Sequence, residues 1–455
     1  MTQHINGRME VQDFIDSVPV SKLQKIIIIL CFVVAALDGF DIAAVGFIAP
    51  ALIAQWSLTP ADLAPLFLSG VFGLMLGSFV FGPLADKFGR KKIIIWSVVI
   101  FSIGTLISAF SPNLTVLIVL RFLTGLGLGG AMPNAVTITS EYCPTKRRST
   151  LVTVMFCGYT IGAAMGGLLA GQLIQLIGWQ GILMIGGIAP LVALPFIYYF
   201  MPESLRFMVL NKFSKEKIDA VIQKMVPNGQ PIPELVAAVT EKQNVSVREL
   251  FSKDYIAGTL LFWCAFTMGS IIIYMISSWM PTILKNEGFN MQSASWITSA
   301  FQIGGTVGAL IIAYFMDKLG HSRTLTISYV IGAICVLALS AGVVNLNTML
   351  IVLGIFGIGA GISGSHIGIH VFCSSYYPTH CRSTGVSWAG GAGRLGSFIG
   401  SGAVGWLMVS GLSGEQIVNL LTIPAFLAAI SMFLITRLMK NKKKIAAMHL
   451  QKANV

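Results

Sequence analysis

Long apolar runs alternate with short polar loops along almost the whole chain. A helix that crosses a bilayer needs about 20 mainly apolar residues, and we count about twelve such runs. Spans are predicted at 26–50, 64–85, 93–111, 114–140, 149–175 and 180–201, then at 256–282, 293–315, 324–344, 347–375, 383–409 and 415–437. The pattern therefore predicts an all-α membrane protein with twelve transmembrane helices.

Part of the first half of the chain is echoed in the second. Asp86-Lys87-Phe88-Gly89 is echoed by Asp317-Lys318-Leu319-Gly320, and 144–150 is echoed by 378–384. The two echoes have nearly the same offset, as expected for one duplication. Such duplication is how many secondary transporters are built. We therefore expect two six-helix bundles related by a pseudo-twofold axis.

A polar stretch separates the two sets of spans. It is rich in lysine and carries scattered proline and glycine, so we expect a linker with one or two short amphipathic helices. The predicted divisions are a first bundle, a cytoplasmic linker, and a second bundle with a basic tail, at 1–201, 202–254 and 255–455.

Composition excludes a soluble protein. Of the 455 residues, 55% are hydrophobic and only 11% are charged, whereas about a quarter are charged in soluble domains. The net charge of +12 does not indicate nucleic-acid binding, because the basic residues lie in short loops. All but three of the 30 Lys and Arg residues, namely Lys285, Arg121 and Arg394, fall on the side of the termini. Both termini are therefore predicted to be cytoplasmic.

Two carboxylates lie near the middle of the first span. Asp38 and Asp41 are three residues apart, so they share nearly one helix face. Two ionised carboxylates this close in a low dielectric repel each other, so at least one is expected to accept a proton. The pair is our candidate for proton coupling. A permanent pairing with a cation or a helix end is the structural alternative.

Arg121 begins the glycine-rich stretch of the fourth span, where glycines allow close helix contact. An arginine cannot shed its proton, so it needs an anion. The membrane aspartates and an anionic substrate are both possible partners, and snorkelling is a third possibility. Glu141 closes the same helix beside Arg147 and Arg148. It is assigned with the aspartates to proton coupling, with a gate or loop salt bridge as the alternative.

Arg394 lies well inside the eleventh span, and the neighbouring spans hold almost no acidic residue. An uncompensated arginine is suited to a carboxylate, which its planar fork binds at two points. We therefore predict that Arg394 binds substrate, with an aspartate of the first half as the competing partner.

The loop after the second span, 82–92, is predicted to form a latch on the cytoplasmic side. Asp86 is expected to pair with Arg90 or another arginine in one conformation only. Gly82 and Gly89 are expected to allow tight packing and a sharp turn.

His366 and His370 in the tenth span share a helix face. Polar packing is the favoured interpretation, a proton relay comes next, and a metal site lacks a third ligand. No metal or organic cofactor is expected.

The loop 82–92 matches the signature of the major facilitator superfamily. Within it, the chain resembles the aromatic acid/proton symporters, above all the 4-hydroxybenzoate and protocatechuate permeases. The residues that carry the resemblance are Asp38-Gly39-Phe40-Asp41, 46–52, 121–133, Pro202-Glu203-Ser204 and Tyr377-Pro378-Thr379. The second copy of the loop departs from the signature at His321 and Ser322, so a gating role there stays open.

This resemblance implies a monomeric importer of small aromatic carboxylates, driven by protons, in a bacterial inner membrane. It also implies essential roles for Asp38 and Asp41 and matches Arg121, Glu141 and Arg394 to charged positions of the family. The alternatives are a symporter of sugar acids or dicarboxylates, and a receptor that binds aromatic acids without transport. An enzyme is disfavoured, since the sequence shows no nucleophile triad, metal cluster or nucleotide loop.

Overall fold

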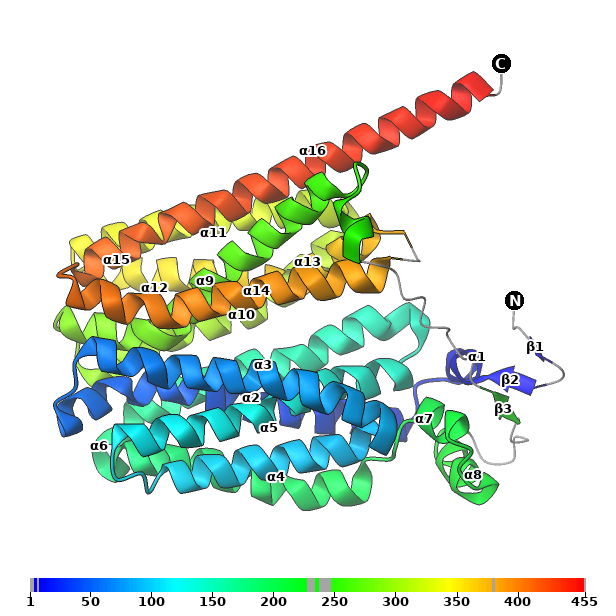
Figure 1. Ribbon diagram of the computed structural model, residues 1–455, viewed down its shortest axis with the longest axis horizontal. Helices are drawn as coiled ribbons and strands as arrows, with labels where there is room; N and C mark the ends of the chain where they lie inside the picture. The colour runs from blue at the N-terminus through cyan, green and yellow to red at the C-terminus, as the bar shows by residue number, and fades with distance from the viewer. Residues whose placement is uncertain (1–3, 6–7, 227–233, 237–246, 379–380, 454–455) are drawn as a thin grey trace. The chain divides into compact units, whose positions relative to one another are not determined.

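Long helices dominate the computed structural model (Figure 1). It describes the chain except for residues 1–3, 6–7, 227–233, 237–246, 379–380 and 454–455. The helices form two compact units. Unit 1 comprises Met1–Ala44 and Ser69–Lys242, and unit 2 comprises Val45–Leu68 and Gln243–Val455. The C-terminal part of α2 and the N-terminal part of α3 thus belong to unit 2, where Phe67 packs edge-on against Trp279.

The first half of the chain contains short elements at both of its ends and one between α5 and α6. They are β1 (His4–Ile5), β2 (Arg8–Glu10), α1 (Val11–Ser17), η1 (Thr145–Arg147), α7 (Leu205–Leu210), α8 (Lys215–Gln223) and β3 (Leu235–Val236). Its long helices are α2 (Lys22–Trp56), α3 (Pro60–Phe88), α4 (Arg90–Ser108), α5 (Leu114–Tyr142) and α6 (Arg148–Phe200).

The second half is helical throughout the part that the structure describes. Its elements are η2 (Val247–Phe251), α9 (Ile256–Asn286), α10 (Met291–Leu319), α11 (His321–Val344), α12 (Thr348–Ile358), η3 (Gly359–Ser363), α13 (Ser365–Tyr376), α14 (Arg382–Val409), α15 (Gly414–Leu420) and α16 (Thr422–Ala453). The tenth predicted span is interrupted, because η3 is a π-helix between α12 and α13.

Ten helical stretches among the described residues are long and apolar enough to cross a membrane. One of them contains α6, which holds two spans because Gly178, with φ 68°, breaks its helical geometry. The 28-residue helix α14 covers the eleventh predicted span. All twelve predicted spans therefore lie on observed helices, and the predicted all-α membrane fold is confirmed.

Glycines let α5 lie directly against two neighbouring helices. A Cβ added to Gly125 or Gly129 would lie 2.3 Å from a backbone carbonyl oxygen of α3. A Cβ on Gly127 would lie 2.7 Å from the backbone nitrogen of Phe101 in α4. Because each glycine faces a backbone, α5 and the arginine near its start are held at a fixed distance from both helices.

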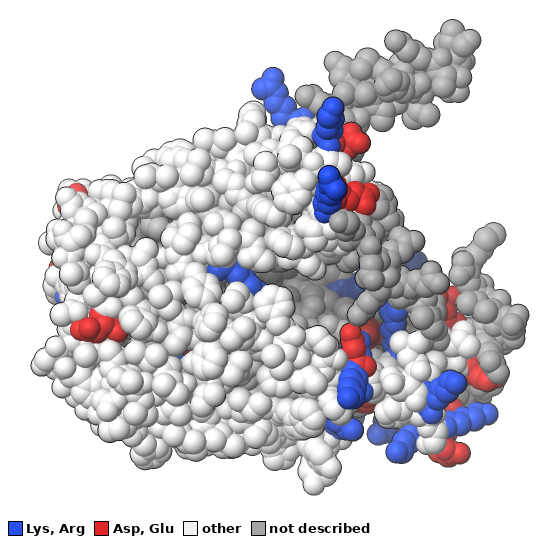
Figure 2. Space-filling model, viewed as in Figure 1, with Lys and Arg blue, Asp and Glu red and all other residues white. Residues whose placement is uncertain are grey.

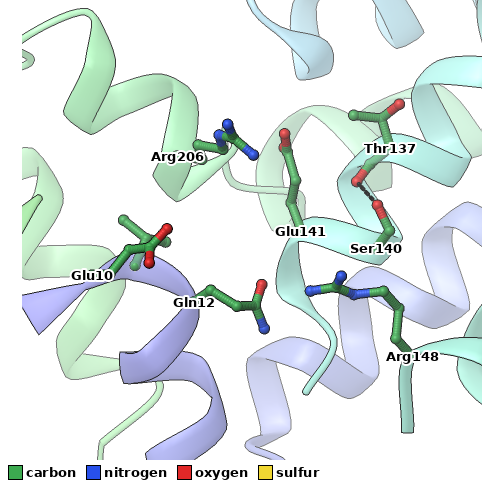
Figure 3. Close-up of a pocket in the computed structure, with 8 residues that line it drawn as sticks. Glu10, Gln12, Thr137, Ser140, Glu141, Arg148 and Arg206 are labelled. Carbon is green, nitrogen blue, oxygen red and sulfur yellow. Dashed lines mark hydrogen bonds between the residues drawn. The ribbon is translucent and has the colours of Figure 1, made fainter. Parts of the chain in front are cut away.

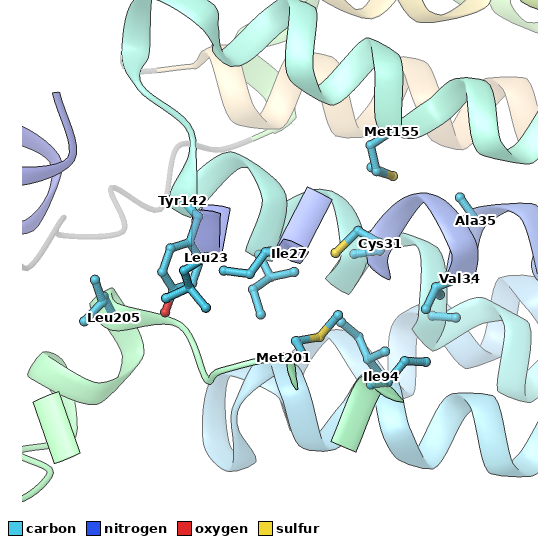
Figure 4. Close-up of a cluster of buried hydrophobic side chains, with 14 of the residues drawn as sticks. Leu23, Ile27, Cys31, Val34, Ala35, Ile94, Tyr142, Met155, Met201 and Leu205 are labelled. Carbon is cyan, nitrogen blue, oxygen red and sulfur yellow. The ribbon is translucent and has the colours of Figure 1, made fainter. Parts of the chain in front are cut away.

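The end of unit 1 that carries α1, α7 and α8 is here called the polar end, and charged side chains gather there (Figure 2). Beneath it lies a hydrophobic cluster that joins α2, α4, α5 and α7, with Leu23, Ile27, Ile94, Tyr142 and Leu205 among its members (Figure 4). The chain before α2 belongs to this cluster, because α1 buries Val11, Phe14 and Ile15 in it.

A small sheet completes the polar end. Strand β2 pairs antiparallel with β1 and parallel with β3, with Met9 opposite Leu235. The N-terminal segment and the linker are therefore held together by main-chain hydrogen bonds. One or two short linker helices were expected from the sequence, and the structure has two, α7 and α8.

Candidate functional site

A buried ion pair lies in the centre of unit 1. Arg121 Nη1 lies 3.2 Å from Asp41 Oδ2, and the two side chains are only 3% and 2% exposed. Arg121 Nη2 donates to the hydroxyls of Thr105, Ser108 and Thr124, at 2.9, 3.2 and 3.1 Å. The Thr105 hydroxyl in turn donates to Asp41. Of the partners that the sequence left open for Arg121, the structure therefore shows a membrane aspartate.

Asp38 has different surroundings. It is 1% exposed, and its Oδ1 has no hydrogen-bond partner among the described residues. Between the two aspartates, Gly39 lies against α6, where an added Cβ would be 2.0 Å from the carbonyl oxygen of Tyr159. This contact fixes the face of α2 that carries both carboxylates. The two aspartates thus share a face, as predicted, and within the described part of the chain Asp41 is the one that pairs with a cation.

Arg394 lies on α14 in unit 2. Among the described residues its guanidinium has no hydrogen bond or ion pair, and its side chain is partly exposed. A neighbouring face of α14 turns Leu395 and Ile399 outward. A third face packs on α9, where the Thr267 hydroxyl donates to the carbonyl oxygen of Ala392 at 2.9 Å. Arg394 therefore lies on the remaining face, apart from both the apolar surface and the helix contact.

The polar end of unit 1 holds the predicted latch residues. Arg90 Nη2 lies 3.0 Å from Asp86 Oδ1 and 3.9 Å from Glu141 Oε1. The Asp86 side chain is 57% exposed and that of Arg90 only 16%. The pairing of Asp86 with Arg90 predicted from the sequence is therefore present, at the mouth of a partly buried cluster.

Glu203, from the short Pro202-Glu203-Ser204 motif, holds the turn before α4. Its Oε1 accepts hydrogen bonds from the backbone N–H groups of Arg90 and Lys91, at 2.8 and 3.2 Å. A carboxylate at a helix N-terminus is favoured by the unpaired N–H groups and the helix dipole. Gly89 has φ 98°, and an added Cβ would lie 2.2 Å from Glu203 Oε2. The sharp turn predicted at Gly89 is present.

Gly82 does not show the tight packing that was expected of it. An added Cβ there would meet no described atom within 4 Å. The physical reason is its position on a face of α3 without a close neighbour in this structure.

Glu141 lines a cavity of about 190 Å³ at the polar end, together with Gln12, Arg148 and Arg206 (Figure 3). It lies 20 residues beyond Arg121 on α5, which corresponds to about 30 Å along a helix. The structure therefore does not bring Glu141 together with Asp38 and Asp41, with which it was grouped. Its ion-pair partner is Arg90 of α4, whereas Arg148, one of the two arginines expected beside it, lines the same cavity.

The N-terminal helix α1 is attached to the same region through Asp16. Its carboxylate accepts hydrogen bonds from the backbone N–H and the hydroxyl of Thr145, at 2.6 and 2.7 Å. Partial burial raises the pKa of Asp16, but the bonds from Thr145 and Gln12 outweigh it and leave the pKa lowered. This contact ties the start of the chain to the loop that follows α5.

Sequence reasoning missed the polar residues that surround the buried pair and the cap on α4. Thr105 and Ser108 are three residues apart within an apolar span, and that spacing is a signal that could have been used. Glu203 was quoted only as part of a motif. Its role depends on the contact between the linker and α4, which no local pattern reveals.

The chain is similar to known membrane transporters over most of its length. The sequence model of the Major Facilitator Superfamily matches residues 31–401. The chain is 39% identical over 428 residues to the gallate transporter of Pseudomonas putida, covering 94% of this chain and 95% of that protein. It is 38% identical over 431 residues to the 4-hydroxybenzoate transporter PcaK of Acinetobacter baylyi, covering 93% and 94%.

Among solved structures, the chain is similar to the xylose transporter XylE from E. coli in a partially occluded inward-open conformation. The TM-score is 0.71 at 16% identity, with 92% of this chain and 98% of that chain covered. At that identity the likeness concerns the fold alone. Together with the match over most of the sequence, it shows that this multi-pass membrane protein belongs to the Major Facilitator Superfamily.

Proposed function

We propose that the protein is a proton-coupled symporter that imports small aromatic carboxylates by alternating access. The observation that carries the proposal is the similarity, at 38–39% identity over nearly the whole chain, to transporters named for gallate and 4-hydroxybenzoate. The geometry supports it, because unit 2 holds a cation without a protein partner among the described residues, and unit 1 holds two buried carboxylates.

Arg394 is proposed to bind the substrate carboxylate. A guanidinium inside an apolar span is costly unless an anion accompanies it. Arg121 already has Asp41 and three hydroxyls, whereas Arg394 has no such partner in the described part of the chain. A bidentate carboxylate would supply both the charge and the hydrogen-bond acceptors that Arg394 lacks.

The proton is proposed to bind at the pair formed by Asp38 and Asp41. Burying a carboxylate without a hydrogen-bonded cation is expensive, and Asp38 has one oxygen without a partner in the described structure. A proton on Asp38 removes this cost. It also lowers the repulsion felt by Asp41, which strengthens the bond to Arg121. Loss of the proton would weaken that bond and favour another arrangement of α2 and α5.

The polar end is proposed to face the cytoplasm of a bacterium, with the protein in the inner membrane and both termini inside. The asymmetry of Lys and Arg supports this orientation. Arg90, Asp86 and Gly89 then belong to a cytoplasmic gate, and Glu141 contributes to it rather than to the central carboxylates. Transport as a monomer, with the proton as the only coupling ion and no cofactor, is part of the proposal.

The test is uptake of labelled benzoate and 4-hydroxybenzoate into proteoliposomes, with and without an inward proton gradient. The wild type should accumulate at least one acid against its gradient only when protons flow inward. Asp41→Asn should abolish this accumulation while sparing exchange of substrate across the membrane. The matched variant Asp13→Asn, on the short helix α1 outside the spans, should accumulate normally.

Two results would contradict the proposal. If the wild type transports neither acid but transports a sugar acid or a dicarboxylate, the substrate class is wrong. If Asp41→Asn still accumulates substrate fully, proton coupling does not pass through this residue.

A further inference from the structure

Two histidines and a phenylalanine form a cluster inside unit 2. His366 and His370 lie one turn apart on α13, with ring centroids 5.9 Å apart. Both rings stand edge-on to Phe266 of α9, at 5.6 and 4.6 Å. Phe266 itself is 1% exposed, so the imidazoles rest on a rigid aromatic base.

The imidazole nitrogens of His366 and His370 make no hydrogen bond to the described part of the protein. Nδ1 of His366 is buried and has no hydrogen-bond partner in the described structure, and no hydrogen bond of His370 is seen among the described residues. A buried polar group without a partner costs about 1–3 kcal/mol. Simple polar packing does not account for such a group, because packing that serves stability satisfies polar atoms.

The helix that carries the histidines is irregular just before them. The π-helix η3 ends at Ser363, three residues before His366. The hydroxyls of Ser328 and Ser365 lie 2.8 and 2.6 Å from the carbonyl oxygen of Gly361 and stabilise this irregular turn. Single π-turns inside α-helices occur frequently at functional sites.

The cluster faces the same part of α14 as Arg394. An added Cβ on Gly390 would lie 3.6 Å from Cε1 of His370, and Gly390 is one turn before Arg394. Gly391 lies on that side as well, and a Cβ there would meet no described atom within 4 Å.

We infer that His366 and His370 bind the ring hydroxyl groups of the substrate while Arg394 holds its carboxylate. This inference rests on the proposed function and assigns to the same site a preference for hydroxylated over unsubstituted aromatic acids. A neutral imidazole carries one N–H donor and one acceptor nitrogen, which match the acceptor and the donor of a phenolic hydroxyl. Two imidazoles one turn apart suit one or two hydroxyls on the side of the substrate ring opposite its carboxylate. Phe266 fixes the orientation of the two imidazoles.

The preference follows from the cost of unpaired polar groups. A site built to hydrogen-bond a hydroxyl rejects the analogue that lacks it, because the polar groups of the site then stay unpaired. Benzoate would leave both imidazoles without a hydrogen bond, whereas the hydroxyl group of 4-hydroxybenzoate would form a hydrogen bond with at least one of them.

The experiment measures initial uptake of labelled benzoate and 4-hydroxybenzoate by the full-length protein in proteoliposomes. The quantity of interest is the ratio of kcat/KM for the two acids. We expect the wild type to favour 4-hydroxybenzoate and His370→Phe or His366→Phe to lower the ratio about tenfold, the equivalent of one hydrogen bond. Uptake of benzoate should stay within about threefold of wild type, since its carboxylate contact is intact.

Two further variants separate recognition from folding. His370→Gln keeps a donor and an acceptor and should restore part of the ratio. Ser374→Ala lies one turn further on the same face of α13, where the hydroxyl already donates to the carbonyl oxygen of Val371. It should leave the ratio unchanged.

An unchanged ratio in both phenylalanine variants, or a wild type without preference for the hydroxylated acid, would overturn the inference. An equal loss of both acids in the Phe and Gln variants would also overturn it, since the histidines would then serve a step common to both substrates. If the wild type transports neither acid, the proposed function itself has failed.

Discussion

Arg121 and Arg394 are both arginines within apolar spans, yet their surroundings are opposite. Arg121 is 3% exposed, pairs with Asp41 and donates to three hydroxyls. Arg394 is partly exposed and has no ion pair or hydrogen bond in the described part of unit 2. The first arginine completes a closed polar cluster, whereas the second has bonding capacity left for a ligand.

The difference separates a charge that the protein neutralises from a charge that it leaves available. The two arginines are not equivalent positions of the duplication, because they are 273 residues apart, whereas the echoed motifs are 231 and 234 residues apart. In the proposed mechanism, unit 1 supplies internal charges that respond to a proton, and unit 2 supplies the group that an anionic substrate must satisfy. Removing each arginine should therefore affect different properties.

The largest effect on stability is expected from Arg121→Met. The substitution leaves Asp41 buried without its cation, which typically costs about 3–5 kcal/mol. Thermal unfolding of the purified protein in detergent should show a strongly lowered Tm. The double variant Arg121→Met/Asp41→Leu removes both charges and should recover much of the stability, but not proton-driven uptake. Equal Tm values for the single and the double variant would mean that the pair contributes little.

Arg394→Lys should affect binding rather than stability. Lysine keeps the charge but loses the planar fork, so the affinity for substrate should fall by about 1–3 kcal/mol, as for a charged hydrogen bond. Because Arg394 has no partner in the described structure, the free energy of unfolding should change by less than about 0.5 kcal/mol. Equilibrium binding and thermal unfolding of the same preparation check both values. An unchanged affinity would shift the substrate carboxylate to Arg121.

The spans and the buried charges could be predicted from the sequence because they are local properties. An apolar run of sufficient length predicts a span wherever it packs, and a charge within it indicates a special role. The partner of Arg121 could not be chosen in this way. The choice depends on Gly39 placing α2 against α6, and on the glycines of α5 bringing Arg121 to the same depth as Asp41.

The polar end was the least predictable region. The residues before α2 contain no long apolar run, so no local pattern predicts how they pack. Yet β2 pairs with β3, more than 200 residues later in the chain, and α1 buries three apolar side chains. Glu141 was grouped with the membrane aspartates because it is a carboxylate at the end of a span. Counting residues along α5 places Glu141 about 30 Å from Arg121. This distance favours the loop salt bridge over a place beside the membrane aspartates.

The two copies of the loop motif offer a matched pair of substitutions with a moderate effect. Gly89 and Gly320 have nearly the same backbone geometry, with φ of 98° and 85°. Alanine in this region of φ and ψ costs about 1–3 kcal/mol. At Gly89 the new Cβ would also displace Glu203, whereas at Gly320 it would meet no described atom within 4 Å.

Gly89→Ala should therefore lower the stability more than Gly320→Ala, by about 0.3–1 kcal/mol for the lost carboxylate at the start of α4. Thermal unfolding of both variants measures the difference. In the Gly89→Ala background, Glu203→Gln should add little further loss, because the cap is already disturbed. A full additional loss there would show that Glu203 keeps its place despite the new side chain.

The smallest effect on stability is expected from Asp86→Asn. The Asp86 side chain is 57% exposed, and exposed ion pairs contribute about 0–1 kcal/mol. Transport should respond more than stability does. If Asp86 and Arg90 belong to the cytoplasmic gate, losing the carboxylate weakens the state in which the gate is closed, and uptake becomes slower. Intrinsic affinity for substrate should stay the same, apart from a shift in the populations of the two states.

The second copy of the motif supplies the comparison, because Asp317 is exposed and has no ion pair among the described residues. Asp317→Asn should slow uptake less than Asp86→Asn. Labelling of a cysteine introduced on the cytoplasmic side should rise in Asp86→Asn, and normal uptake without such a rise would leave the motif with a role in folding or topology only.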